Sequence, residues 1–344
     1  MAHRVTPHIS YCESRMNEAD SERRSRLLSL KLRTLVREHL GLASDPEGTP
    51  EVFGLGAAFI TDDATWVLID GDSARALGPV LAWTSRFSKP VHLLVERDAG
   101  IIARRAQFFS SAITVWHVNE RSLLPAVPDP HLPAIDAKPE HVAMMELIAT
   151  SGADALIEHG IVVGEVRGLE MCRVVDDKAT GETRLEVGMG VNDREAFLMV
   201  HGELPKEEAL RNVIEAVAVH REPDAMVHPF NQFGAERMHR WRALQNPASI
   251  GFAELSPADP PIRRTNLKDA VPCVAAGKTA SGDTAVAVFV HGIDLDLVPF
   301  AVDAASRCGV QQVVVVARAK DITPSMQKMA ERASIPVSFQ YLNI

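Results

Sequence analysis

Apolar residues along the chain follow three patterns, and each pattern predicts a different kind of element. Short unbroken runs such as Val313 to Val316 lack polar alternation and predict buried parallel strands. Between Glu165 and Val191, apolar and polar residues alternate, which predicts a β-hairpin with one face of each kind. The helical spacing of Leu28, Leu32 and Leu35 predicts a helix over residues 22–40.

One of these patterns occurs twice. Residues 65–118 and 285–342 both read strand, helix, strand, helix, strand, and Val67 to Gly71 corresponds to Val288 to Gly292. Buried parallel strands joined by helices predict an α/β fold. We therefore expect two terminal βαβαβ units with parallel sheets, related by an internal duplication, that flank an α+β middle domain.

Proline-rich stretches separate the predicted parts of the chain, because proline disfavours continuation of a helix or a central strand. The predicted order is an N-terminal helical arm and linker (1–50), a first α/β unit (51–124), a proline-rich linker (125–137), an α+β middle domain (138–255), a second linker (256–284) and a second α/β unit (285–344).

Composition indicates an ordinary globular protein. The chain has 344 residues, is 46% hydrophobic and carries a net charge of -9, which opposes attraction of the whole surface to nucleic acid. The sequence has no apolar run that would span a membrane and no apolar signal core, so we expect a cytoplasmic protein with no membrane partner. The four cysteines are widely spaced, which argues against a zinc site or a disulfide framework. The oligomeric state is unknown.

The predicted helix at 22–40 has a basic face that includes Arg23, Arg26 and Arg37. Such a face is found on arms that bind nucleic acid or a membrane surface, and on helices that dock against a domain and turn a charged face to water. The second interpretation is favoured.

Acidic steps follow the first predicted strand of each terminal unit, at Asp70-x-Asp72 and at Asp294-x-Asp296. Ligands of such sheets bind at the carboxyl ends of the strands, and paired carboxylates there would suit Mg²⁺. Acidic residues are also favoured at helix starts, and this is the preferred interpretation of both steps. Neither unit has a glycine-rich phosphate loop, so dinucleotide and P-loop sites are disfavoured.

The middle segment holds the carboxylates with the strongest chemical interest. Glu165 and Glu170 are expected on the first strand of the hairpin and Glu186 on the second. A carboxylate among apolar neighbours, as predicted for Glu170, must be paired, protonated or bound to a metal. Arg173 and Arg184 are close enough in sequence to supply positive charge.

The order of helix, Gly164-Glu165-Val166, hairpin, Leu185-Glu186-Val187 and helix resembles the core of the PD-(D/E)XK phosphodiesterases, the restriction-endonuclease-like fold. The resemblance implies that Glu165 or Glu170 is the first acid and Glu186 the second. Together they would hold Mg²⁺ or Mn²⁺ and position water for attack on a phosphodiester, with Arg173 or Arg184 supplying the missing positive charge.

A second patch of interest lies at residues 228–242, where His228, Arg237 and Arg240 accompany aromatic residues. Arginine suits phosphate and aromatic rings suit bases, so this patch is the candidate site for nucleic acid or a phosphorylated small molecule. The alternative is an amphipathic helix whose arginines face water, which is the favoured interpretation.

Two functional hypotheses follow. The first is a metal-dependent phosphodiesterase or nuclease-like protein that acts on nucleic acid or a phosphate ester through Glu165, Glu170 and Glu186. The second is a non-enzymatic ligand-binding or interaction protein, in which the hairpin carboxylates pair with neighbouring arginines and are structural.

Overall fold

The chain forms an α/β protein of two compact units, Met1–Pro130 (unit 1) and His131–Ile344 (unit 2). The structure is a computed structural model. It describes residues 9–189, 194, 206–222, 228, 231, 233–264 and 271–342, with the backbone alone for residues 9–19 and 206.

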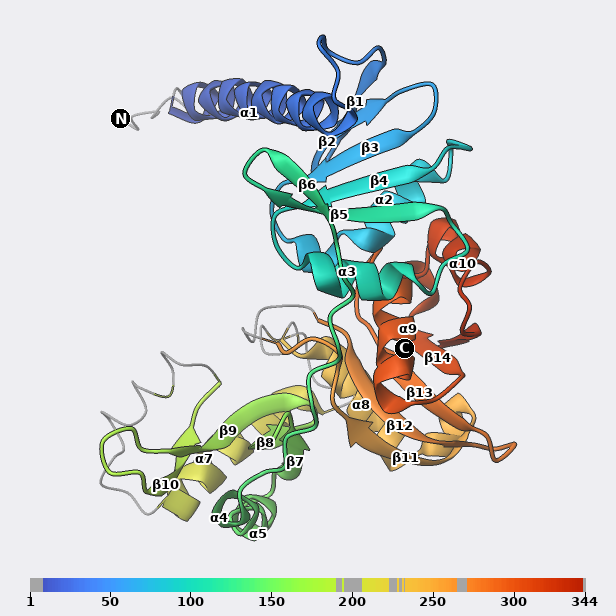
Figure 1. The fold of residues 1–344 in the computed structure, drawn as a ribbon. Helices are drawn as coiled ribbons and strands as arrows, with labels where there is room; N and C mark the ends of the chain where they lie inside the picture. Colours follow the sequence, from blue (N-terminus) through green and yellow to red (C-terminus); the bar gives the residue numbers. More distant parts are fainter. Residues whose placement is uncertain are drawn as a thin grey trace, which may run out of the picture. The chain divides into compact units, whose positions relative to one another are not determined.

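Unit 1 contains one six-stranded sheet (Figure 1). Strands β3, β4 and β5 are parallel, and the others pair antiparallel. The 3-10 helix η1 and helices α2 and α3 lie in the connections between the parallel strands. The elements in sheet order are β1 (Thr49–Phe53), β2 (Gly56–Ile60), β3 (Thr65–Ile69), β4 (Val91–Val95), β5 (Ile113–Asn119) and β6 (Ser122–Pro125), with η1 (Ser73–Arg75), α2 (Leu77–Thr84) and α3 (Ala99–Ala106) between them.

Helix α1 (Ile9–Leu40) docks on this sheet through its second half. Leu32, Leu35 and Val36 are buried against strand residues, and Gly41 follows the helix with φ 65°. Part of the basic face is paired, since Arg24 Nε lies 2.6 Å from Asp70 Oδ2. These contacts are those of a docking helix, and the helix starts earlier than the predicted residue 22.

The first part of unit 2 is a four-stranded antiparallel sheet in the order β10-β9-β8-β7. Its apolar face packs on helices α5 and α7 around Ile148, Val162, Leu210 and Ile214. The elements are α4 (Pro139–Val142), α5 (Met145–Thr150), β7 (Asp154–Glu158), β8 (Ile161–Val166), β9 (Leu169–Asp176), β10 (Thr183–Val187), α7 (Lys206–Ala218) and η2 (Val219–Arg221). The helix predicted to start near Asp193 lies outside the described residues.

The rest of unit 2 is a five-stranded sheet in the order β11-β12-β13-β14-β15. Strands β13, β14 and β15 are parallel, and helices α9 and α10 connect them. Helix α8 packs on the sheet through Ala243, beside Phe252 and Phe289. The elements are α8 (Ala235–Gln245), η4 (Pro247–Ile250), β11 (Phe252–Ala258), β12 (Cys273–Thr279), β13 (Thr284–Phe289), α9 (Leu297–Cys308), β14 (Val313–Ala317), η5 (Ala319–Asp321), α10 (Pro324–Ala330) and β15 (Val337–Tyr341).

The predicted linker at 256–284 is wrong, because it contains the end of β11 and all of β12. Pro257 lies within β11, which is tolerated because β11 forms the edge of the sheet and its free side needs no backbone donor. The small residues of β12 give little hydrophobic pattern, yet Ala275 is fully buried between neighbouring strands.

The two parallel sheets share a topology. Strands β1 to β5 and β11 to β15 have the same order and the same relative directions, two antiparallel pairs followed by two parallel pairs. In each sheet a helix, α1 or α8, precedes the first strand. The internal duplication stays a prediction, since a shared topology can arise without common ancestry.

None of the helices in the described part of the chain combines the length and the apolar character required to cross a lipid bilayer.

Candidate functional site

Two tight turns bring the carboxylates of unit 2 together. The β7–β8 loop is His159-Gly160, with φ values of 52° and 75°, and the β8–β9 loop is Arg167-Gly168, with φ values of 47° and 83°. Positive φ at both loop residues is typical of the type I′ hairpin turn.

The turn at Arg167-Gly168 corrects the prediction of one long first strand. Residues 161–176 form two strands, so Glu165 and Glu170 become directly opposed across β8 and β9. A β-bulge next to Glu165 shifts the register there. The two carboxylates nevertheless reach different arginines and form two separate centres.

The inner centre consists of Glu158, Glu165, Arg237 and Arg240. Arg237 lies 2.6 Å from Glu158 and 2.7 Å from Glu165, and Arg240 lies 3.4 Å and 3.2 Å from the same two carboxylates. The arginines are three residues apart on α8, which places them on one face of that helix. Their side chains are 4% and 2% exposed. Two cations and two anions therefore balance in a buried site.

Electrostatics holds the inner centre in its charged form. Burial opposes ionisation of Glu158, but Arg237 and Arg240 outweigh it and lower the pKa of Glu158 to about 2. Burial likewise opposes the charge of Glu165, whose pKa is lowered by Arg240 and Arg237. Both carboxylates are therefore ionised and fully engaged at neutral pH.

Glycine and one buried arginine position α8 against the sheet. A Cβ atom on Gly168 would lie 2.4 Å from the backbone carbon of Arg237, so only glycine permits this approach. The buried Arg221 donates from Nη2 to the carbonyl oxygen of Arg167 at 2.7 Å and from Nη1 to that of Phe233 at 3.1 Å. Burial lowers the pKa of Arg221 to about 10. The β8–β9 turn and the start of α8 are thus fixed together.

The outer centre consists of Glu170, Glu186, Arg173, Arg194 and Arg264. The three arginines surround Glu170 at 2.6, 3.5 and 3.5 Å, and Arg194 also lies 3.2 Å from Glu186. The Arg173 side chain is 31% exposed, so this centre opens towards solvent, whereas Arg194 and Arg264 are buried.

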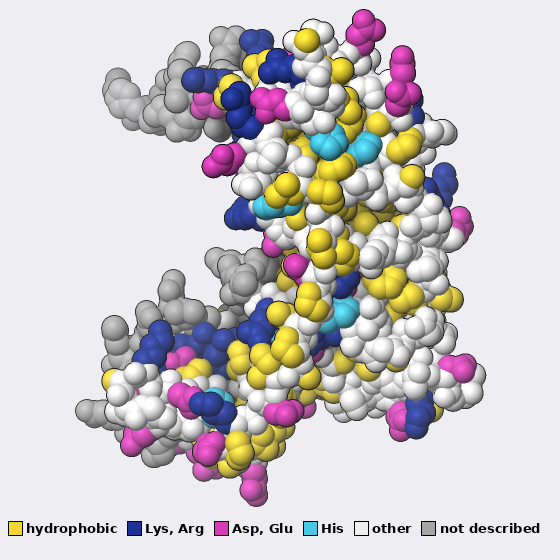
Figure 2. Space-filling model, in the orientation of Figure 1, with side chains coloured by type: hydrophobic (Ala, Val, Ile, Leu, Met, Phe, Trp, Pro, Cys, Tyr) yellow, Lys and Arg dark blue, Asp and Glu magenta, His cyan; other side chains and the backbone are white. Residues whose placement is uncertain are grey.

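Among the described residues, positive charge exceeds negative charge in the outer centre. Three guanidinium groups face two carboxylates, and Arg184, which also contacts Glu186 at 2.7 Å, is balanced by its own partner Asp177 at 2.8 Å. Burial lowers the pKa of Arg264, and Arg237 nearby lowers it further. Among the described residues, Arg264 Nη1 is buried without a hydrogen-bond partner. Figure 2 shows Lys and Arg side chains interspersed with Asp and Glu side chains on the part of the surface that contains the four-stranded sheet.

The structure therefore brings together only some of the site residues that were predicted from the sequence. Glu170, Glu186 and Arg173 meet in the outer centre, whereas Glu165 belongs to the inner one. Arg237 and Arg240 do not line a surface patch, and the favoured view that they face water is also wrong, because the inner carboxylates hold them in the interior. His228 instead stacks on His220, with ring centroids 3.9 Å apart.

Three contributors were missed from the sequence: Glu158 as a partner of the α8 arginines, and Arg194 and Arg264 as partners of Glu170. An Arg263-Arg264 pair in a supposed linker was the available signal for the last. Within the described residues, no cluster of three or more His, Cys, Asp or Glu side chains is arranged to hold a metal ion.

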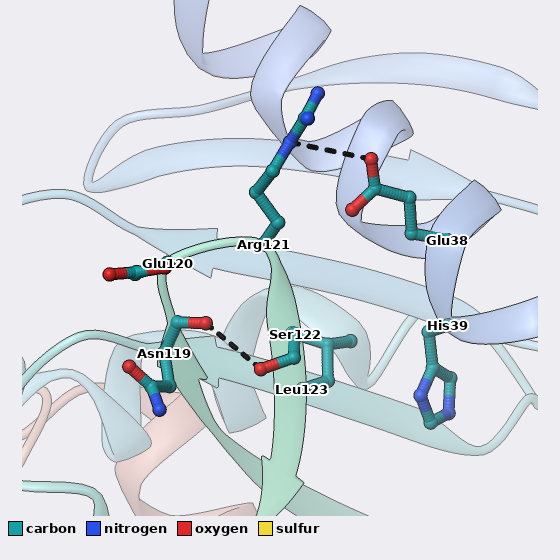
Figure 3. Close-up of a pocket in the computed structure, with 7 residues that line it drawn as sticks. All are labelled: Glu38, His39, Asn119, Glu120, Arg121, Ser122 and Leu123. Atoms are coloured by element: carbon teal, nitrogen blue, oxygen red, sulfur yellow. Dashed lines mark hydrogen bonds and ion pairs between the residues drawn. The ribbon is translucent and has the colours of Figure 1, made fainter.

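Two other features are a pocket in unit 1 and the two acidic steps that follow the first parallel strand of each sheet. In unit 1 a pocket of about 500 Å³ lies between the end of α1 and the β5–β6 turn, where Arg121 reaches to within 3.5 Å of Glu38 (Figure 3). Of the two acidic steps, Asp72 and Asp296 stand at helix N-cap positions, but neither side chain makes a capping hydrogen bond.

A serine, a histidine and an aspartate lie in the order of a hydrolase triad near α9. His131 Nε2 is 3.1 Å from Ser306 Oγ, but its Nδ1 is 3.8 Å from Asp303 Oδ1, which is too long for a hydrogen bond. The aspartate therefore does not orient the imidazole as a triad requires.

No protein-family model, curated protein or solved structure matches this chain.

Proposed function

We propose that unit 2 is a non-enzymatic binding module for a phosphorylated ligand, and that the outer centre receives the phosphate group. The observation that carries the proposal is the convergence of three arginines on one carboxylate, with an excess of positive charge and an unpartnered guanidinium nitrogen among the described residues. A planar guanidinium fork matches phosphate oxygens in bidentate geometry.

In this proposal Glu170 holds the arginines in place while no ligand is bound. Its carboxylate is 6% exposed and accepts from Arg173 at 2.6 Å, so it supplies part of the negative charge that a phosphate would bring. A phosphate that enters beside the partly exposed Arg173 gains contacts to the arginines and competes with Glu170 for them. We expect the module to act in the cytoplasm, since the described cysteines Cys172, Cys273 and Cys308 are free thiols.

Phosphate on a small molecule and phosphate in a nucleic-acid backbone share this chemistry. The test is calorimetric titration with a mononucleotide and with a single-stranded oligonucleotide of the same base, each at two salt concentrations. If the ligand is a phosphorylated small molecule, the mononucleotide and the oligonucleotide should bind with similar affinity. A nucleic-acid partner predicts tighter binding of the oligonucleotide, with an affinity that falls steeply as salt rises.

Two substitutions are expected to change the affinity for phosphate in opposite directions. Arg173→Gln removes the accessible arginine and is expected to weaken phosphate binding at least tenfold, equivalent to about 1.4 kcal/mol. Glu170→Gln removes the competing charge and is expected to strengthen binding. Arg211→Gln is the matched control, because Arg211 is exposed and pairs with Glu207 within one helix. Equal affinities for the wild type, Arg173→Gln and Glu170→Gln would refute the proposal.

A second candidate is the metal-dependent phosphodiesterase, with Glu170 and Glu186 as ligands of Mg²⁺ or Mn²⁺ and Arg173 beside them. Glu165, the third ligand predicted from the sequence, is engaged by Arg237 and Arg240. This candidate is supported by Arg194, which contacts Glu170 at 3.5 Å and Glu186 at 3.2 Å, so that one guanidinium group bridges the two carboxylates. Displacement of Arg194 would leave two carboxylates for one metal.

Cleavage assays distinguish the two candidates. Single- and double-stranded DNA and RNA are incubated with the protein in Mg²⁺ and in Mn²⁺, with Glu186→Ala as the comparison. Cleavage by the wild type that is lost in Glu186→Ala favours the phosphodiesterase. Equal background cleavage by both proteins rules it out and leaves the binding module.

A further inference from the structure

The carboxyl ends of β13 and β14 carry a second group of polar side chains, separate from the two arginine centres. His291 follows β13, Arg318 and Lys320 follow β14, and α8 contributes His239 and Arg242. In sheets with parallel strands, ligands bind outside the carboxyl ends of those strands. The position is therefore the one at which a site is expected in this half of unit 2.

Two histidines at this edge share one hydrogen bond. His239 Nε2 lies 3.1 Å from His291 Nδ1, with ring centroids 5.4 Å apart and ring planes at 27°. One nitrogen must donate and the other accept, so a single proton lies between the rings. His239 is 5% exposed, and its Nδ1 has no hydrogen-bond partner within the described residues, whereas His291 is half-buried.

The charges that act on this pair are mostly positive. Arg242 and Arg318 act on His239, and Arg318 and Lys320 act on His291. The acid that acts on both histidines, Asp321, accepts from Arg318 at 2.6 and 3.0 Å and from the backbone nitrogen of Gly292 at 3.1 Å. Burial and then the neighbouring His291 lower the pKa of His239 to about 3, and burial and then Arg318 lower that of His291. The pair is therefore neutral at neutral pH.

The pair can nevertheless accept one more proton without losing its hydrogen bond. If His291 becomes an imidazolium, its Nδ1–H donates to Nε2 of a neutral His239, and its Nε2–H is available to a ligand. The proton comes from solvent and no bond other than this N–H is formed. An anion nearby would stabilise that imidazolium, and Arg242 and Lys320 would attract the anion, because Asp321 is already paired with Arg318.

We propose that the carboxyl ends of β13 and β14 form a second oxyanion site, at which binding is coupled to the uptake of one proton by His291. His239 is a positioning residue, because it is buried and acts through His291. The site is independent of the outer centre, whose guanidinium groups do not titrate near neutral pH.

Sulfate is the probe, because it keeps its charge between pH 5 and 8 and any proton taken up must come to the protein. Calorimetry at pH 6.0 in two buffers with different ionisation enthalpies measures the uptake directly. We expect uptake of up to one proton per site and an affinity that increases by up to about tenfold for each pH unit of acidification. Sulfate binding without proton uptake would overturn the proposal.

Variants assign the proton to its residue. His291→Gln is expected to abolish the uptake, and Lys320→Gln to weaken sulfate binding several-fold while the uptake remains. Arg173→Gln in the outer centre and His117→Gln in unit 1 are controls that leave the uptake unchanged. Imidazole nitrogen shifts of His291 on sulfate addition give a readout that does not depend on the overall affinity. Uptake that persists in His291→Gln, or unchanged imidazole shifts, would contradict the assignment.

Discussion

The inner and outer centres of unit 2 are built from the same two residue types, glutamate and arginine, but they differ in balance and in exposure. The inner centre matches two carboxylates with two guanidinium groups in the interior. The outer centre sets three guanidinium groups against two carboxylates, and Arg173 there reaches solvent. Balance with burial indicates a structural role, whereas excess charge with access to solvent indicates a binding role.

The strongest way to break this comparison is to remove one charge from the inner centre. Glu165→Gln leaves Arg237 and Arg240 buried with half of their negative charge, and we expect a loss of roughly 3–5 kcal/mol in the free energy of unfolding. Chemical denaturation measures the loss. Glu207→Gln, in an exposed pair with Arg211 at 2.9 Å, is the control, with an expected change below about 0.5 kcal/mol. If both variants lose equally little, the inner centre is not a structural element.

The pH dependence of stability tests the role of Glu158 in the inner centre. Its pKa falls from 4.5 in the unfolded chain to about 2 in the folded protein, so its contribution to stability is fully present above pH 4.5 and is lost as the pH falls towards 2. The contribution is on the order of 3 kcal/mol, since each unit of pKa shift corresponds to about 1.4 kcal/mol. The stability difference between wild type and Glu158→Gln should therefore shrink between pH 5 and pH 3. A difference that stays constant over this range would show that Glu158 is not held in its charged form.

Backbone geometry offers a third test of the inner centre. Gly168→Ala introduces both a strained residue at φ 83° and a Cβ atom 2.4 Å from the Arg237 backbone. Gly181→Ala is the matched control, because Gly181 has φ 74° and open space around its Cβ position. Left-handed strain costs each variant about 1–2 kcal/mol, and the clash adds about 1–3 kcal/mol in Gly168→Ala alone. Equal losses in the thermal or chemical unfolding of the two variants would mean that α8 can move away from the turn.

Some of this arrangement could be predicted from the sequence and some could not. Uninterrupted apolar runs such as Val313 to Val316 identified the parallel strands, because buried strands need no polar alternation. Glu170 was expected to be paired, protonated or bound to a metal, and the structure shows it paired with Arg173, which lies three residues away and is therefore a local partner.

The remaining contacts depend on long-range geometry that local patterns do not encode. The turn at Arg167-Gly168 lacks the usual Asn-Gly or Asp-Gly signal, so one strand was expected where two exist. Arg237 and Arg240 resemble surface residues in a helical pattern, and only the approach of α8 to β7 and β8 brings them to Glu158 and Glu165. β12 was missed because small residues such as Ala275 and Gly277 resemble a loop in composition.

The smallest expected effect on stability comes from the outer centre, and it is the one that separates structure from binding. Arg173 pairs with Glu170 at the boundary with solvent, where an ion pair contributes at most about 1 kcal/mol, so Arg173→Gln should change the unfolding free energy by less than that. Arg264 and Arg194 also remain to neutralise Glu170 in the variant. The same substitution is expected to weaken phosphate binding at least tenfold. If Arg173→Gln instead causes a large loss of stability and leaves phosphate binding unchanged, the outer centre has the structural role of the inner one, and its excess positive charge does not bind a ligand.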